Sequence, residues 1–155
     1  MPATKLREQL LAARTALLES TYGLSDAAAR SRPGSDEWSV IEVLAHIPDV
    51  DAHWLAQAAI VGEDEDHVFV NFDDARWKAE HPNPPSADLA TMLEEVQLSF
   101  AKVLVKLSTL TAADLQRSAR HPNGSPYRVR DIFARYSVHD ENHARQISKI
   151  RSQTE

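Results

Sequence analysis

The chain has 155 residues, of which 43% are hydrophobic and 26% are charged, values typical of a globular protein. This length predicts a single domain over residues 1–155, with a core large enough to fold without disulfides. A formal net charge of −6 and the absence of cysteine argue against a basic phosphate-backbone binder and exclude thiolate metal sites and thiol nucleophiles. We therefore expect no nucleic-acid partner, and any metal must be held by imidazole and oxygen ligands.

Residues 1–20 carry charges throughout and lack the apolar core of a secretory signal. No apolar run reaches the ~18 residues that a membrane span requires. We therefore expect a cytoplasmic protein without a membrane partner. The low glycine content, four residues in all, favours helices over sheet.

The first expected helix covers residues 3–20. Its apolar positions are leucines at helical spacing: Leu6, Leu10, Leu11, Leu17 and Leu18. Gly23 and the SRPGS run at 31–35 interrupt the helical pattern. Residues 24–30 between them have room for one short turn of helix.

A second helix is expected over residues 39–61. Ser39 and Glu42 form a capping-box pattern, in which each side chain satisfies a backbone N–H of the other residue. Pro48 lies inside this helix and is expected to kink it, because proline has no N–H to donate. The expected buried face consists of apolar residues at helical spacing: Val40, Val43, Ile47, Trp54, Ala58 and Val61.

His46 lies at the edge of that face, and Glu42, Asp49 and His53 lie on the same flank. Such a polar strip is either a solvated border or a set of inward-pointing functional groups. In the functional interpretation, His46 points into the bundle as a metal ligand, with Asp49 or Glu42 nearby. His53 lies ~10 Å further along the helix axis, so it is not expected to share an ion with His46.

Residues 62–85 change in composition from acidic to aromatic to proline-rich. We expect a long insertion here between the second and third helices, docked on the bundle by its aromatic residues. Long segments of this kind are often functional. The two histidines within it, His67 and His81, are expected to be exposed and not to bind metal.

Ser86 is expected to begin a third helix, with an apolar stripe that continues to Leu107. Residues 111–114 then have the pattern of a new helix cap followed by a short helical turn. Residues 119–127, which contain the sequence HPNG, are expected to form turns.

The last helix is expected to run from about residue 128 to residue 150. Its buried face consists of Val129, Ile132, Phe133, Tyr136, Ile147 and Ile150. His139 and His143 are one turn apart and lie within this face. Burying two unpaired imidazoles is costly, whereas one metal ion would satisfy a nitrogen on each. The alternative is a chance pair on a half-exposed helix, or an inward histidine bonded to a carboxylate or hydroxyl.

Four long helices predict an all-α protein, an antiparallel-type four-helix bundle. The histidine pair does not fit a zincin protease, which needs Glu directly after the first His and a third ligand further on. Asp140 occupies the Glu position, and only 12 residues follow His143. The Glu-x-x-His pattern of di-iron bundles is also absent.

Two blocks of sequence carry a family resemblance. They are RP at 32–33 with EWSVIEVLAHI at 37–47, and HDENHARQI at 139–147. With these blocks in this order, the chain resembles the DinB/YfiT-like four-helix-bundle proteins over most of its length, although residues 62–85 match nothing in that pattern. The resemblance implies a divalent metal ion on the inner face of the bundle, bound by His46, His139 and His143.

The resemblance also implies a metal-dependent enzyme acting on a small-molecule substrate, either a hydrolase or a transferase that uses a low-molecular-weight thiol. Three neutral imidazoles leave open positions where an ion activates water or a thiol. Zinc, nickel or iron suits such ligands. The alternative is a metal-binding or stress-response bundle without catalysis. A purely structural helical module would require the three histidines to be a coincidence, and a homodimer is possible.

Two carboxylates are candidate catalytic residues. Asp140 is expected either to orient a metal ligand or to form a salt bridge with an arginine at the border of the helix. Asp49, one turn after His46, is expected to hydrogen-bond a ligand or to act as a general base. Glu141 falls on the far side of the last helix and is expected to be solvated.

Overall fold

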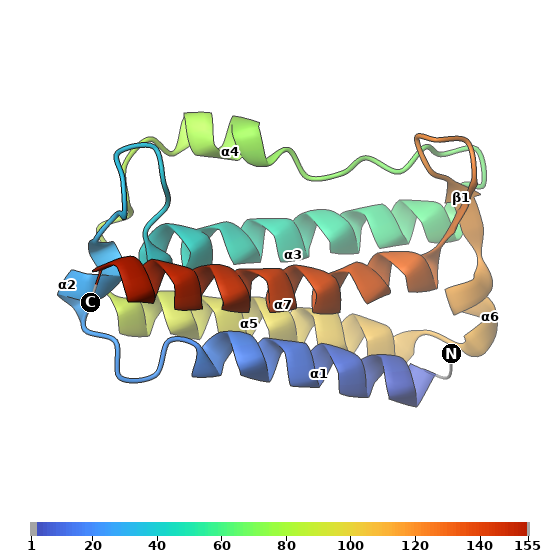
Figure 1. Ribbon diagram of the computed structural model, residues 1–155. Coiled ribbons are helices and arrows are strands. Elements are labelled where there is room, and N and C mark those ends of the chain that lie inside the picture. The colour runs from blue at the N-terminus through green and yellow to red at the C-terminus, as the bar shows by residue number, and fades with distance from the viewer. Residues whose placement is uncertain (1–2, 155) are drawn as a thin grey trace.

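The computed structural model describes residues 3–154, and four long helices form its body (Figure 1). They are α1 (Ala3–Glu19), α3 (Val40–Glu63), α5 (Leu89–Thr109) and α7 (Val129–Thr154). Three short helices lie between them: α2 (Asp26–Arg30), α4 (Asp74–Glu80) and α6 (Ala112–Gln116). The predicted all-α fold, a four-helix bundle, is confirmed.

Side-chain caps begin several of these helices where the sequence predicts them. Ser39 and Glu42 form the expected capping box of α3, and Thr111 and Asp114 form a second one at α6. Helix α3 continues through Pro48 as one element. All the residues of its predicted apolar face are buried: Val40, Val43, Ile47, Trp54, Ala58 and Val61.

The third long helix begins later than expected. Asp88, and not Ser86, is the N-cap of α5, and its carboxylate accepts a hydrogen bond from the Thr91 backbone N–H. Arg30 donates to the backbone carbonyls of Pro85, Ser86 and Ala87. These bonds hold the chain before Asp88 out of the helix, and Arg30 lies too far away in sequence for a local pattern to reveal them.

Two clusters of buried apolar side chains show the directions of the long helices. In one cluster, the N-terminal halves of α1 and α7 meet the C-terminal halves of α3 and α5. In the other, the C-terminal halves of α1 and α7 meet the N-terminal halves of α3 and α5. Helices α1 and α7 are therefore parallel to each other, and α3 and α5 run together in the opposite direction (Figure 1). The expected antiparallel arrangement is wrong for two pairs of neighbouring helices, α1 with α7 and α3 with α5.

Parallel neighbours require a connection that returns along the bundle. Residues 64–88 make this return on the outer side of α3 and carry α4 (Figure 1). That this segment is an insertion stays a prediction. Within the segment predicted to form turns, residues 122–125 do turn, and they join β1 (Ser118–Arg120) and β2 (Pro126–Arg128) into a hairpin that was not predicted. Strands of three residues are too short to give a readable alternation.

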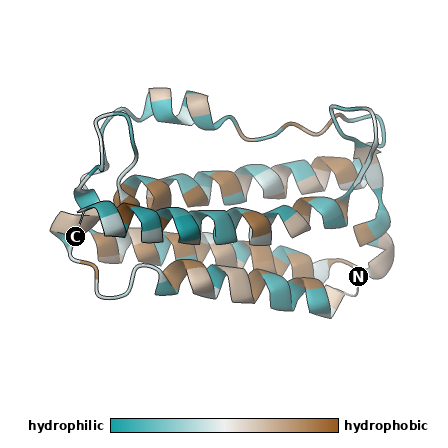
Figure 2. Ribbon diagram, viewed as in Figure 1, coloured by the Kyte–Doolittle hydropathy of each residue, from teal (hydrophilic) through white to brown (hydrophobic). Residues whose placement is uncertain are grey.

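A buried polar layer lies between the two apolar clusters. Arg14 of α1 is 2% exposed, and its guanidinium donates to the carboxylates of Asp51 on α3 and Asp140 on α7. It also donates to the backbone carbonyl of Val96 on α5, so that one side chain joins all four long helices. The outward face of α7 is largely hydrophilic (Figure 2). None of the described helices is both long and apolar enough to cross a membrane.

Candidate metal centre

The three predicted histidine ligands converge in the structure. His46 of α3 and His139 and His143 of α7 each offer a ring nitrogen, and these atoms lie within 4.8 Å of one another. The ring centroids of His46 lie 5.5 Å from His139 and 5.4 Å from His143. The Nε2 atoms of His139 and His143 are 2.8 Å apart. The cluster arises because α3 and α7 run antiparallel and each presents its histidines towards the other.

The cluster fits a divalent metal ion. Both ring nitrogens of His46 and Nδ1 of His139 are buried without a hydrogen-bond partner among the described residues, a costly arrangement that coordination would relieve. Zinc holds imidazole nitrogens at ~2.0–2.1 Å, so two ligand atoms can be at most ~4.2 Å apart. Side-chain shifts of less than ~1 Å would bring all three nitrogens within that limit.

Electrostatics keep these imidazoles in the form that binds metal. Burial, together with the neighbouring His143, lowers the pKa of His46 to about 3. Burial is also the main cause that lowers the pKa of His139 and of His143. All three rings are therefore neutral at physiological pH, with lone pairs available to a cation.

Gln146 orients one of the ligands. Its Oε1 lies 2.6 Å from Nδ1 of His143. Since an amide oxygen only accepts, Nδ1 carries the proton and Nε2 presents its lone pair to the centre of the cluster. Sequence reasoning missed Gln146, although its place three residues after His143 puts it on the same helix face.

Asp74 brings a carboxylate to the cluster from the first turn of α4. Its Oδ1 lies 3.2 Å from Nε2 of His46, in a direction that makes no hydrogen bond. The Asp74 side chain is 70% exposed and therefore accessible to water. Sequence reasoning also missed this residue, although Asp73 as the N-cap and Asp74 as the first residue of the DARWKAE segment were a readable helix-start signal.

The two carboxylates predicted to be catalytic are engaged elsewhere. Asp49 is exposed, and its Oδ2 accepts a hydrogen bond of 2.7 Å from the indole Nε1 of Trp77 in α4. Asp140 is fully buried and forms the salt bridge with an arginine, Arg14, that was one of the two expectations. Its Oδ1 lies 3.9 Å from Nδ1 of His139, beyond hydrogen-bond distance. Catalytic roles for both carboxylates stay predictions.

The remaining polar residues on the flank of α3 do not join the cluster. His53 is bonded outside the histidine cluster, because its Nε2 lies 2.7 Å from the Val70 carbonyl oxygen. Glu42 is bound by Ser39 and by the guanidinium of Arg32. Glu42 thus holds the segment around Arg32 against the start of α3. His53 holds the segment around Val70 against the middle of α3.

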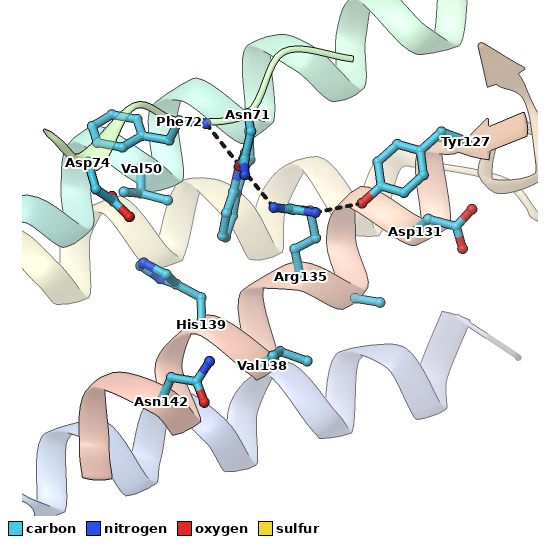
Figure 3. Close-up of a pocket in the computed structure, with 12 residues that line it drawn as sticks. Val50, Asn71, Phe72, Asp74, Tyr127, Asp131, Arg135, Val138, His139 and Asn142 are labelled. Carbon is cyan, nitrogen blue, oxygen red and sulfur yellow. Dashed lines mark hydrogen bonds between the residues drawn. The ribbon is translucent and has the colours of Figure 1, made fainter. Parts of the chain in front are cut away.

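Two cavities open beside the histidines. The first, of about 490 Å³, includes His139 and Asp74 in its wall, and Asn71 and Phe72 of the connection between α3 and α5 also line it (Figure 3). The second, of about 410 Å³, is lined by His46, His143 and Asp74. Volumes of this size suit small molecules. The cluster therefore lies between two chambers, and Asp74 borders both.

Comparison with known proteins identifies the family of this chain. A sequence model described as the DinB superfamily matches residues 9–147. The chain belongs to the DinB superfamily. The resemblance inferred from the two histidine-bearing blocks is thereby confirmed.

Two bacterial relatives cover most of the chain at low identity. YuaE of Bacillus subtilis (strain 168) is 24% identical over 144 residues, which span 86% of this chain and 89% of YuaE. BH0277 of Halalkalibacterium halodurans, whose name describes a candidate metal-dependent hydrolase, is 25% identical over 118 residues. That match spans 74% of this chain and 66% of BH0277.

A solved structure shares the fold. YfiT from Bacillus subtilis, described as a probable metal-dependent hydrolase with an unusual four-helix bundle topology, superposes with a TM-score of 0.77. The match covers 96% of this chain and 85% of YfiT at 17% identity. The parallel pair α3 and α5 with its long return connection also departs from an up-and-down bundle.

Proposed function

We propose that this chain is a metal-dependent hydrolase that acts on a small molecule. His46, His139 and His143 hold one divalent ion, with zinc, nickel or iron as the candidates. The observation that carries the proposal is the convergence of three neutral imidazoles, with both nitrogens of His46 buried and unpartnered, between two cavities. The descriptions of BH0277 and YfiT support hydrolysis over thiol transfer.

The protein's own groups divide the remaining work. A bound ion would supply Lewis acidity, which polarises a substrate oxygen and lowers the pKa of water. Asp74 takes the place of Asp49 as our candidate general base, because its exposed carboxylate lies beside the cluster and borders both cavities. Gln146 holds the Nδ1–H tautomer of His143. Trp54 and Phe72 offer apolar contact surface to a bound substrate.

Metal content tests the centre. Protein purified without chelators is expected to carry about one divalent ion per chain by elemental analysis. His46→Ala and His143→Ala should lose that ion, because each removes one of three ligands. His53→Ala is the matched control, since His53 lies on the same helix and bonds the Val70 carbonyl instead. Full metal content in both ligand variants would contradict the centre.

Activity then separates the reactions. The metal-loaded protein is assayed against a panel of esters and amides, and separately for conjugation of a low-molecular-weight thiol. Hydrolysis that disappears with EDTA and returns with the metal is the expected result. Thiol conjugation alone would favour a transferase, and metal binding without either reaction would favour a non-catalytic bundle. Hydrolysis that survives metal removal contradicts the proposal.

A further inference from the structure

The wall of the cavity of about 490 Å³ beside His139 combines apolar side chains with a few polar and charged ones (Figure 3). Its lining includes the apolar residues Val50, Trp54, Phe72, Ala134 and Val138. Small-molecule sites commonly combine such a lining with a few polar groups that fix the orientation of the ligand. The cavity is therefore suited to a compound with an apolar body.

Arg135 supplies a cation to this wall, one helical turn before His139 on α7 (Figure 3). Its Nη1 donates to the Tyr127 hydroxyl at 3.1 Å, and its Nη2 donates to Oδ1 of Asn71 at 2.8 Å. Both acceptors are neutral. The guanidinium also lies over the rings of Trp54 and Phe69, at 5.1 and 5.0 Å from their centroids. Aromatic and amide partners hold Arg135 in place without neutralising it.

No carboxylate within residues 3–154 pairs with Arg135, although an acidic residue lies one turn away. Asp131 is held instead by Arg128, through the backbone N–H at 2.8 Å and through the guanidinium at 3.1 and 3.2 Å. Nε of Arg135 is buried without a partner. Each Nη atom has a second N–H that these bonds do not use. The cavity wall, which also includes Asp131 and Asp74, thus keeps one cation without a carboxylate partner and with N–H donors to spare.

We propose that this cavity binds a small monocarboxylate with an apolar body, whose carboxylate is held by Arg135 and whose reactive bond points towards His139. The inference rests on the proposed function and names its substrate class. Arginine presents paired N–H donors that match the two oxygens of a carboxylate. A dianionic phosphate fits less well, because one cation faces it and Asp74 borders the same cavity. The neutral amide of the same acid lacks the charge that Arg135 would pair.

Binding to metal-free protein tests the site independently of hydrolysis. Phenylacetate and hydrocinnamate are each compared with their uncharged amides by ligand-observed NMR titration of EDTA-treated protein. The carboxylates are expected to bind about tenfold more tightly than the amides, as for a hydrogen bond to a charged group. Arg135→Gln should abolish this preference, and Arg135→Lys should restore part of it.

A control at another cation separates recognition by Arg135 from a general effect of charge. Lys149→Gln removes a cation from the other cavity and should leave the preference for carboxylates unchanged. Each variant is checked for an unchanged thermal unfolding transition.

The outcomes decide the proposal. Equal binding of acids and amides by the wild type, no binding of any acid, or a preference that survives Arg135→Gln overturns it. A preference for carboxylates that appears only after metal loading, and is the same in Arg135→Gln, also overturns the proposal. That result would support the metal centre. If the purified protein binds no metal ion but still prefers carboxylates through Arg135, the proposed function is contradicted and the carboxylate site is not.

Discussion

His46 shows how one side chain can reveal a ligand site. It is fully buried in α3, yet neither of its ring nitrogens has a hydrogen-bond partner in the described chain. The surrounding rings of Trp38, Phe72 and Trp77 offer contact but no acceptor oriented to it. A buried polar group without a partner costs free energy, and an ion shared with His139 and His143 would recover it.

Removing the orienting partner of His143 should weaken metal binding without removing a ligand. Gln146→Ala frees Nδ1 of His143 from its 2.6 Å bond, so the ring loses its fixed tautomer. We expect metal affinity to fall by about 10- to 100-fold. Competition with a chromophoric chelator measures the change. Gln153→Ala, on the same cavity wall, is the control, and equal affinity for both variants would count against the role of Gln146.

The metal-free protein should lose stability on acidification, in part through His46. Burial lowers the pKa of His46 from 6.5 to about 3. Between these two pH values the unfolded chain binds a proton that the folded protein does not. The free energy of unfolding therefore decreases as the pH is lowered. The slope is up to about 1.4 kcal/mol per pH unit for one such group. Asp140 opposes it, because burial raises its pKa from 3.8 to about 6.

A comparison with His46→Phe isolates this effect. The variant keeps an aromatic ring but removes the titrating group, while the contribution of Asp140 stays in both proteins. Urea unfolding in EDTA, between about pH 7 and about pH 4, should show a shallower loss of stability for the variant. Parallel curves would show that His46 takes up a proton in the folded state as easily as in the unfolded chain.

At the scale of elements, α4 carries Asp74 and depends on few anchors for its position. The indole of Trp77 donates to Asp49 and packs against the rings of Trp38 and His46. Asp49 therefore acts, in our view, as a positioning residue for α4. This differs from the base predicted from its spacing to His46.

Substitutions at Asp49 distinguish the two roles. Asp49→Ala removes the acceptor of Trp77 and should lower stability by about 0.5–1.5 kcal/mol, with faster hydrogen exchange across α4. Asp49→Asn keeps an acceptor oxygen and should preserve both the exchange pattern and hydrolysis. Abolished hydrolysis in Asp49→Asn, with α4 still protected, would restore the predicted role as general base.

The sequence predicted elements better than their contacts. Apolar periodicity and the caps at Ser39 and Thr111 located the helices, because both signals act within a few residues. His139 and His143 were singled out as candidate metal ligands because imidazoles within an apolar face are unusual, and the family resemblance added His46. Asp74 was missed because it reaches His46 only through the docking of α4. The connection of residues 64–88 is long enough to return along the bundle, which allows α3 and α5 to run parallel. The composition of this segment did not reveal the direction of the helix that follows it.

At the scale of the molecule, Arg14 joins the four long helices. All five of its N–H donors are used, by Asp51, Asp140 and the Val96 carbonyl. Ser99 of α5 donates to Asp51 as well, at 2.6 Å. The layer lies next to the histidine cluster through Asp140, which directly follows His139. Its integrity therefore affects both the fold and the spacing of the ligands.

Loss of the Arg14 cation should be strongly destabilising. Arg14→Met leaves two buried carboxylates without their partner, at a cost of about 3–5 kcal/mol near neutral pH. The deficit should shrink at lower pH, where Asp140, whose pKa is raised by burial, binds a proton and loses its charge. Chemical unfolding at two pH values measures both effects. A deficit that does not change with pH would mean that lost packing, including that of Arg14 over Phe100, causes the instability.

The parallel course of α1 and α7 places the two chain ends at opposite poles of the bundle (Figure 1). Ile150 and Gln153, near the end of α7, line the same cavity as His46 and His143. A polyhistidine tag fused after residue 155 would therefore follow residues that line this cavity and could compete for the ion of the centre, whereas helix α1 contributes no residue to the wall of either cavity. Purification handles for this protein belong on the amino-terminal side.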